Sequence, residues 1–158
     1  MKNSTATLSI LLILFSIYLV FKLSMPSYSV DTTIPQSNFS TDRALVHVKN
    51  MSKKPHAVGF SAHAEVRQYI VSELEKMGLE TSLQEGYTVG DWANYSKATN
   101  ILARIKGSDN GKALLLLSHY DSNPHSSLGA SDAASGVATI LEGVRAFLTE
   151  NKTPKNDI

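Results

Sequence analysis

The sequence predicts an α/β domain, built as a mixed sheet flanked by helices and preceded by one transmembrane helix. Three observations support this fold class. An apolar segment lies close to the N-terminus. From residue 41 onward, helical and strand patterns follow in the order helix, helix, strand, strand, strand, helix. The last strand pattern is a continuous apolar run, which is typical of a central strand covered on both faces.

The first element is the apolar segment Leu8–Leu23, which is interrupted only by two serines and Lys22. A membrane span needs about 20 apolar residues, with a lower limit of about 17, and a terminal lysine can extend its amine to the interface. No cleavage site with small residues follows cleanly. Residues 8–24 are therefore interpreted as a signal anchor in contact with membrane lipid, behind a tail of residues 1–7. A cleaved signal peptide is the alternative.

Residues 25–40 are polar, contain two prolines and show no periodicity, so we expect a linker. The domain of residues 41–158 follows, and we expect it on the non-cytoplasmic side of the membrane. Its first helix is predicted to begin after an N-cap at Ser40 or Thr41 and to end before Pro55. The apolar residues on one face of this helix are Ala44, Leu45, Val48 and Met51.

A second helix is predicted between Ser61 and Gly78. Ser61 can act as the N-cap, and Gly78 can supply the left-handed residue that ends the helix. A stripe at helical spacing indicates the buried face. It comprises Val66, Tyr69, Ile70, Leu74 and Met77.

Three strands are predicted next. The first is Leu79–Glu85, and Gly86–Thr99 is expected to be an irregular polar loop. The second strand, Asn100–Lys106, shows alternating polarity. A strong turn signal at residues 107–111 joins it to the apolar run of residues 112–118, so we expect these two strands to pair in antiparallel fashion.

The last predicted helix runs from Ser135 to Glu150, and Val137, Ile140 and Leu141 are among its inward-facing residues. A sheet of three strands with an exposed edge is a poor place for a domain to stop. We therefore expect this sequence to be the N-terminal part of a longer protein.

Composition limits the possible chemistry. The net charge is +1 and charged residues make up 18% of the chain, which gives no indication of a nucleic-acid surface. The absence of cysteine excludes disulfides, thiolate ligands and cysteine nucleophiles. Any metal ion must be held by nitrogen and oxygen atoms.

A candidate metal site lies after the apolar run. His119 and Asp121 follow the carboxyl end of that strand, and Asp132 lies near the start of the next helix. Zinc accepts imidazole and carboxylate ligands, and Asp121, two residues along an extended segment, can orient the imidazole. The two oxygens of Asp132 can bridge two ions. Spacing alone leaves a structural alternative open, in which His119 forms a strand-end hydrogen bond and Asp132 caps the helix.

A serine hydrolase centred on Ser131 is a weaker alternative. Gly129–Ala133 is a degenerate version of the G-x-S-x-G nucleophile elbow. That elbow requires a buried strand immediately before the serine, and residues 123–128 do not form a strand pattern.

The segments HYDS, GASD and SGVA, at residues 119–122, 129–132 and 135–138, resemble the signature of the zinc-dependent aminopeptidases of metallopeptidase family twenty-eight. Upstream, Pro55–Ser61 and Asn100–Ala103 are also similar to segments of that catalytic domain. The resemblance covers roughly residues 41–158. Together with the N-terminal span, it is greatest to the membrane-bound endoplasmic-reticulum and vacuolar proteases.

The resemblance implies a three-layer zinc-exopeptidase-like fold, of which this chain would hold the N-terminal part. It implies a membrane-anchored aminopeptidase that hydrolyses terminal peptide bonds of a peptide substrate with metal-activated water. By position, His119 would bind one of two zinc ions, Asp132 would bridge both, and the catalytic role of Asp121 would be to orient His119. The family's general-base glutamate and its later zinc ligands do not occur in this chain. The resemblance therefore implies that the chain is inactive by itself. A non-catalytic membrane-anchored ectodomain with a peptidase-like fold is the alternative.

Structural roles are expected for the remaining polar candidates. His47, His56 and His63 are expected on helix surfaces or in packing contacts, and His125 in a solvated loop. Glu142 and Arg145 are interpreted as an ion pair on a helix face. The aromatic residues of the polar loop could line a substrate pocket or cover the sheet edge; they are Tyr87, Trp92 and Tyr95.

Overall fold

The computed structural model describes residues 2–25, 33–90, 95–109, 111–125 and 127–158. The chain divides into two compact units, Met1–Asp31 and Thr32–Ile158. Each unit is described by itself.

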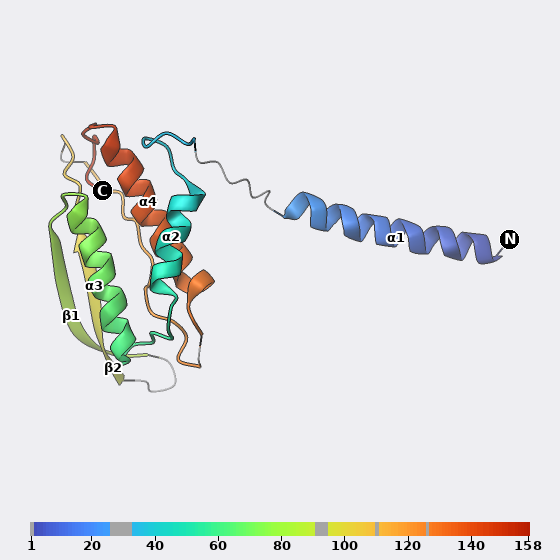
Figure 1. Cartoon of the computed structure of the whole chain (residues 1–158), viewed down its shortest axis with the longest axis horizontal. Coiled ribbons are helices and arrows are strands. Elements are labelled where there is room, and N and C mark those ends of the chain that lie inside the picture. The colour runs from blue at the N-terminus through green and yellow to red at the C-terminus, as the bar shows by residue number, and fades with distance from the viewer. Residues whose placement is uncertain (1, 26–32, 91–94, 110, 126) are drawn as a thin grey trace. The chain divides into compact units, whose positions relative to one another are not determined.

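The first unit is a single helix, α1, from Lys2 to Ser24 (Figure 1). Within it, Ser4–Ser24 is long and apolar enough to cross a membrane. Large apolar side chains around the whole helix are exposed, as on a helix that has no protein core to face. The predicted N-terminal apolar span is therefore present as one helix, while residues 26–32 of the predicted linker lie outside the described residues.

The second unit opens with two helices close to their predicted positions. Helix α2 runs from Thr41 to Met51, and the Ser40 hydroxyl accepts a hydrogen bond from the backbone N–H of Arg43 (3.4 Å), which confirms Ser40 as the N-cap. Helix α3 runs from Ser61 to Lys76. Its N-cap is Phe60, without a side-chain hydrogen bond, so the predicted capping role of Ser61 is wrong.

Two antiparallel strands, β1 (Thr81–Val89) and β2 (Tyr95–Ala103), form a hairpin in which Thr81 pairs with Ala103. The predicted polar loop Gly86–Thr99 is wrong over most of its length, because both of its ends belong to these strands. In β2, Ser96, Ala98 and Thr99 are partly or fully buried, but the β1 part of this stretch, residues 86–89, is exposed on both faces. Its sequence therefore lacks the alternation that marks a half-buried strand.

The predicted pairing of residues 100–106 with the apolar run of residues 112–118 is also wrong. Residues of the C-terminal segment lie between the two: Ile105 and Ile158 exchange both backbone hydrogen bonds (2.8 and 3.0 Å), and the Leu114 N–H donates to the carbonyl of Asp157 (2.8 Å). The apolar run is extended but belongs to no sheet within the described residues. Its leucines are exposed, with 77% for Leu115 and 82% for Leu117.

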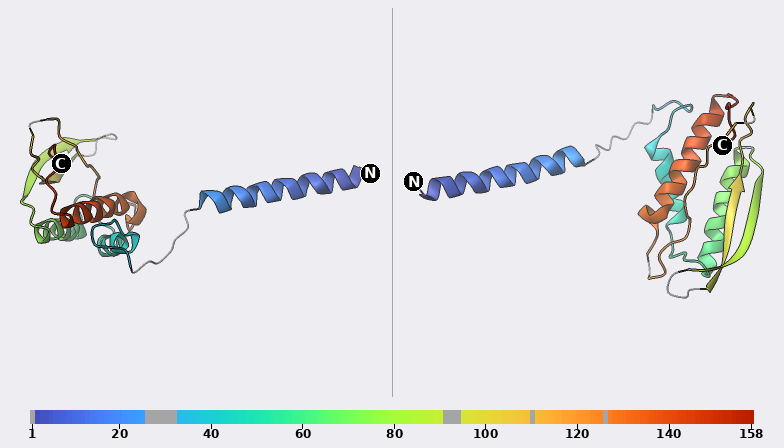
Figure 2. Two further views of the ribbon diagram at one scale, coloured as in Figure 1. Left: turned by 90° about the horizontal axis from the view of Figure 1, so that it is seen from above. Right: turned by 180° about the vertical axis from the view of Figure 1, so that it is seen from behind.

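Helix α4, from Ser135 to Thr149, completes the domain and confirms the last predicted helix. Figure 2 shows α2, α3 and α4 together on one side of the β1–β2 hairpin. The α/β fold class is confirmed. The buried core lies among the three helices and comprises Ala44, Met51, Val66, Ile70, Leu74, Ala134, Val137, Ala138 and Leu141.

Candidate metal centre

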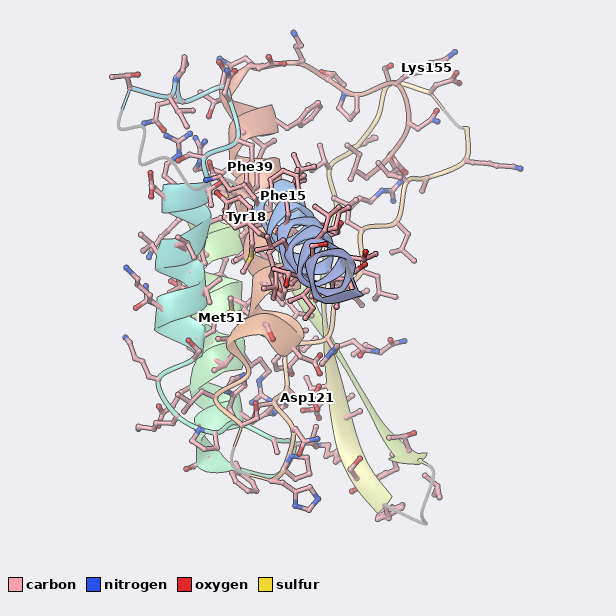
Figure 3. All side chains as sticks on the ribbon, turned by 90° about the vertical axis from the view of Figure 1, so that its right-hand side faces the viewer. Phe15, Tyr18, Phe39, Met51, Asp121 and Lys155 are labelled. Carbon is pink, nitrogen blue, oxygen red and sulfur yellow. The ribbon has the colours of Figure 1, made fainter. Side chains whose placement is uncertain are left out.

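The three predicted site residues meet at one place in the domain. The Nε2 atom of His119 lies 2.8 Å from Oδ1 of Asp132. The Nδ1 atom of the same ring lies 3.0 Å from Oδ1 of Asp121. Each imidazole nitrogen therefore faces a carboxylate, although Asp132 is thirteen residues away from His119 in the sequence. Figure 3 shows Asp121 well away from Lys155 and the other end of the domain.

The extended backbone places His119 and Asp121 on the same side of the chain, as their spacing predicts. The side chain of Tyr120, which lies between them in the sequence, points to the other side of the chain and contacts β2 and α3. Its hydroxyl donates to the carbonyl of Thr99 in β2 (2.8 Å), and its ring stacks on His63 of α3 at 4.6 Å. The strand and the helix thereby fix the segment that carries the site.

Asp132 lies in one wide helical turn, η2 (Ala130–Ala134), that leads into α4. Gly129 precedes this turn with a φ of +67°, a left-handed conformation that glycine adopts without strain. Asp132 itself is extended (φ −128°, ψ 93°), and its peptide bond to Ala133 is cis. Helix α4 begins at Ser135, after Asp132, whose carboxylate remains at the surface.

The site is exposed and negatively charged around its imidazole. The side chains of His119, Asp121 and Asp132 are 55%, 39% and 80% exposed. Partial burial acts to lower the pKa of His119, but the hydrogen bonds to Asp121 and Asp132 outweigh it and raise that pKa above its ordinary value. Two carboxylates thus favour a positive charge at this ring.

These donors fit a zinc ion in chemistry but do not complete its coordination. Zinc ligands lie at about 2.0–2.2 Å, so two ligands of one tetrahedral ion are roughly 3.3 Å apart. The 2.8 Å between His119 Nε2 and Asp132 Oδ1 is within about half an ångström of that separation. Among the described residues, no group of three or more histidine and acidic side chains could hold a metal ion. A closed site would need further donors.

A second charged cluster lies inside the domain, around Glu142 of α4. This side chain is 0% exposed, so the predicted ion pair with Arg145 on the helix face is in fact buried on the carboxylate side. The carboxylate accepts from the Ser40 backbone N–H (2.9 Å), Arg43 Nε (2.9 Å) and Arg145 Nε (2.6 Å). Burial alone raises the pKa of Glu142, but the hydrogen bonds from Arg145, Arg43 and Ser40 hold it below its ordinary value.

The structure also places the other sequence candidates. His47 is buried and contacts the Tyr69 hydroxyl through Nδ1 (2.7 Å), and His125 is exposed in its loop, both as predicted. The rings of Tyr87 and Tyr95 stack at 5.3 Å across the hairpin, while Trp92 lies outside the described residues.

His56 is the residue whose place the sequence did not reveal. It is 1% exposed and lies against the loop that carries the site, not on a helix surface. Two signals set it apart in the sequence: a segment with a proline and a glycine, which indicates a turn, and the similarity of Pro55–Ser61 to a segment of the peptidase domain.

Comparison with known proteins identifies the C-terminal part of the domain. Residues 100–158 match the family described as Peptidase family M28. These residues belong to peptidase family M28. The matched stretch contains His119, Asp121 and Asp132.

Relatives and solved structures extend the similarity over the chain. A vacuolar membrane protease of Candida tropicalis is 31% identical over 99% of this chain. A leucine aminopeptidase precursor of Bacteroides thetaiotaomicron has a TM-score of 0.66 at 27% identity and covers 80% of the chain. A Zn-dependent exopeptidase of Parabacteroides distasonis gives 0.65 at 28% identity, covering 78% of the chain. A glutaminyl cyclase of Bacteroides thetaiotaomicron is as similar, with 0.66 at 27%.

The chain spans only part of each of these proteins. It covers 18% of the length of the Candida tropicalis protease and 46% of each of the three solved chains. The fold is that of zinc-dependent exopeptidases, and the family is one of peptidases.

Proposed function

We propose that this chain supplies part of the metal centre of a membrane-anchored zinc exopeptidase of the aminopeptidase type. The observation that carries the proposal is the convergence of His119 Nε2 and Asp132 Oδ1 at 2.8 Å. The M28 match over residues 100–158 and the similarity to vacuolar membrane proteases support the peptidase class and the membrane. Residues 8–24 would anchor the chain, with the domain on the non-cytoplasmic side.

Each of the three residues has a distinct task. His119 would present Nε2 to zinc, while Asp121 holds Nδ1 at 3.0 Å and so keeps the ring in one orientation and one tautomer. Asp132 uses one oxygen toward His119 and has its other oxygen on an exposed carboxylate, which suits a bridge between two ions. Bound zinc would supply an activated water and polarise the carbonyl of a terminal peptide bond.

The site opens to solvent, as a peptidase acting on a peptide chain requires. Among the described residues, His119 and Asp132 are the two zinc donors that converge. We therefore expect the chain by itself to bind zinc weakly and to release no amino acid from a peptide substrate. The same shortage of donors favours the second candidate function, a non-catalytic membrane-anchored ectodomain.

Zinc titration of the full chain in detergent micelles distinguishes these functions. The chain has five histidines, so each imidazole can be followed by NMR during the titration. We expect zinc to shift the His119 resonances first, and we expect His119→Ala and Asp132→Asn to remove the response. His125→Ala, which changes an exposed histidine of the same loop, is the matched control and should leave the response intact.

A response that does not depend on His119 would refute the metal centre and favour the non-catalytic ectodomain. Release of amino acids from a peptide by the chain alone would refute the expected need for further donors.

A further inference from the structure

His56 lies between the two stems of the loop that separates Asp121 from Asp132. Its backbone N–H donates to the Ser122 hydroxyl at 2.8 Å, and the Ser122 N–H points back to the His56 carbonyl at 3.4 Å. Ser122 directly follows Asp121, and both Ser122 and His56 are 1% exposed. The first stem of the loop is thus attached to His56 through buried hydrogen bonds in both directions.

The second stem of the loop packs against the ring of the same histidine. A Cβ atom added at Gly129 would lie 2.9 Å from His56 Cε1 and 3.2 Å from Nε2, and also 2.9 Å from the Cβ of Ser122. The left-handed glycine therefore fits in direct contact with both residues. Asp132 follows Gly129 by three residues, so this contact fixes the start of the turn that carries Asp132.

The orientation of the His56 ring is itself held by the backbone. Its Nδ1 lies 2.9 Å from the Lys54 carbonyl oxygen. A carbonyl only accepts hydrogen bonds, so Nδ1 carries the proton of the neutral ring and Nε2 carries none. The edge of the ring turned toward Gly129, formed by Cε1 and Nε2, is therefore held in place by a hydrogen bond at the neighbouring ring atom, Nδ1.

We propose that His56 is a positioning residue, which joins the loop stems at Ser122 and Gly129 so that Asp132 meets His119. The inference deepens the proposed metal function and rests on it only for the zinc readout. Without zinc, the contact between His119 and Asp132 is still a measurable feature of the protein.

The experiment compares His56→Ala with His47→Ala in the full chain in detergent micelles. His47 is also buried and hydrogen-bonded, but its hydrogen-bond partner is Tyr69 of α3 and not a residue of the loop between Asp121 and Asp132. Zinc chloride affinity is measured by calorimetry, the His119 imidazole by NMR without zinc, and unfolding by circular dichroism. Losing a partner that orients metal ligands typically costs 10–100-fold in affinity.

We expect His56→Ala to weaken zinc binding about tenfold and to shift the zinc-free His119 resonances toward those of Asp132→Asn. His47→Ala should lower the unfolding temperature. Its zinc dissociation constant should stay within about twofold of that of the unchanged chain, a much smaller change than the loss of affinity expected when a residue that orients metal ligands is removed. His56→Asn, whose amide can still donate to the Lys54 carbonyl, should recover part of the affinity.

Unchanged His119 resonances in His56→Ala would overturn the proposal, as would an equal loss of affinity in His47→Ala. If the unchanged chain binds no zinc, the metal function fails, and the zinc-free His119 spectrum still decides whether His56 positions the loop. If His56→Ala does not fold, Gly129→Ala, whose new Cβ crowds the same ring, tests the contact through the zinc-free His119 spectrum.

Discussion

Two clusters of paired charges in this domain differ in what surrounds them. Glu142 is fully buried, and its carboxylate is saturated by Arg43, Arg145 and the backbone. Asp132 has one imidazole partner and is 80% exposed. Both are carboxylates with nitrogen partners, but only the second leaves an oxygen accessible to a ligand.

The difference in exposure indicates a stabilising role for the Glu142 cluster and a binding role for the Asp132 cluster. A buried carboxylate must be neutralised and hydrogen-bonded, and once it is, removing a partner is costly. An exposed carboxylate gains little from an ion pair, because water and salt screen it. The convergence of Asp132 and Asp121 on one ring therefore contributes little stability, which is the pattern expected of residues kept for binding.

The largest expected effect is the loss of the buried cluster. Glu142→Gln should lower the free energy of unfolding by about 3 kcal/mol or more, because two guanidinium groups and a buried N–H lose their anion. Urea denaturation of the full chain in micelles, followed by circular dichroism, measures it. Glu65→Gln is the control, since the Lys54–Glu65 pair is exposed and should cost less than about 0.5 kcal/mol. Equal losses in the two variants would remove the distinction between buried and exposed pairs.

Acidification should act on the buried cluster and on His47 in the same direction. The pKa of Glu142 is lowered in the folded protein, so its stabilisation is present above the ordinary carboxyl value of 4.5 and is lost as the pH falls through the folded pKa. Burial lowers the pKa of His47 below 6.5, so the unfolded chain takes up its proton first, and stability begins to fall at that pH. Denaturation between pH 7 and 3 should show both losses.

The same series with Glu142→Gln sharpens the assignment. The decrease below pH 4.5 should flatten in this variant while the decrease near pH 6.5 remains. An unchanged slope below pH 4.5 would mean that another carboxyl group controls acid stability.

A glycine of the loop that leads to Asp132 should be more sensitive to substitution than one beside Glu142. Gly129→Ala forces a side chain into a left-handed conformation, which costs about 1–2 kcal/mol, and it brings the new Cβ to 2.9 Å from His56 Cε1. We expect a loss of stability in urea denaturation and displaced His119 resonances. Normal stability with an unchanged His119 spectrum would show that the loop has room that the structure does not indicate.

The smallest effect is expected at Gly143, within α4. Nothing lies within 4 Å of a Cβ added there, and the position is helical. Gly143→Ala should therefore stabilise the domain by roughly 0.5–1 kcal/mol, the difference in helix propensity. Urea denaturation checks the sign, and destabilisation would indicate a close neighbour of α4.

The sequence predicted the helices and the site better than the sheet. Apolar stripes and end signals place α2, α3 and α4 to within a few residues, because helical periodicity depends on the helix's own buried face. The observed strand bounds differ from the predicted ones because β1 is exposed along nearly its whole length, so its sequence carries no alternation that marks a buried face. The apolar run of residues 112–118 does not pair with residues 100–106 because the C-terminal segment lies between them. Asp157 bonds to Leu114 on one side and Ile158 to Ile105 on the other, a long-range contact that no local pattern encodes.

In the site too, contacts between residues close in the sequence could be predicted, and contacts between distant residues could not. His119 and Asp121 share a side because they are two residues apart in an extended segment, and local spacing is enough to show it. The contact with Asp132 depends on how the loop stems are joined, and the roles of His56 and Ser122 in that junction come from residues 66 positions apart. Likewise, the burial of Glu142 depends on Ser40 and Arg43, far upstream in the chain.

One measurement tests the comparison most directly: the zinc affinity and the stability of the full chain, determined together for His119→Ala and Glu142→Gln. The proposal predicts opposite results, with His119→Ala losing zinc affinity at least tenfold while its free energy of unfolding changes by less than about 0.5 kcal/mol. Glu142→Gln should lose stability and keep its zinc affinity while folded. Undiminished zinc binding by a folded His119→Ala chain would contradict the assignment of His119 and Asp132 as a metal centre.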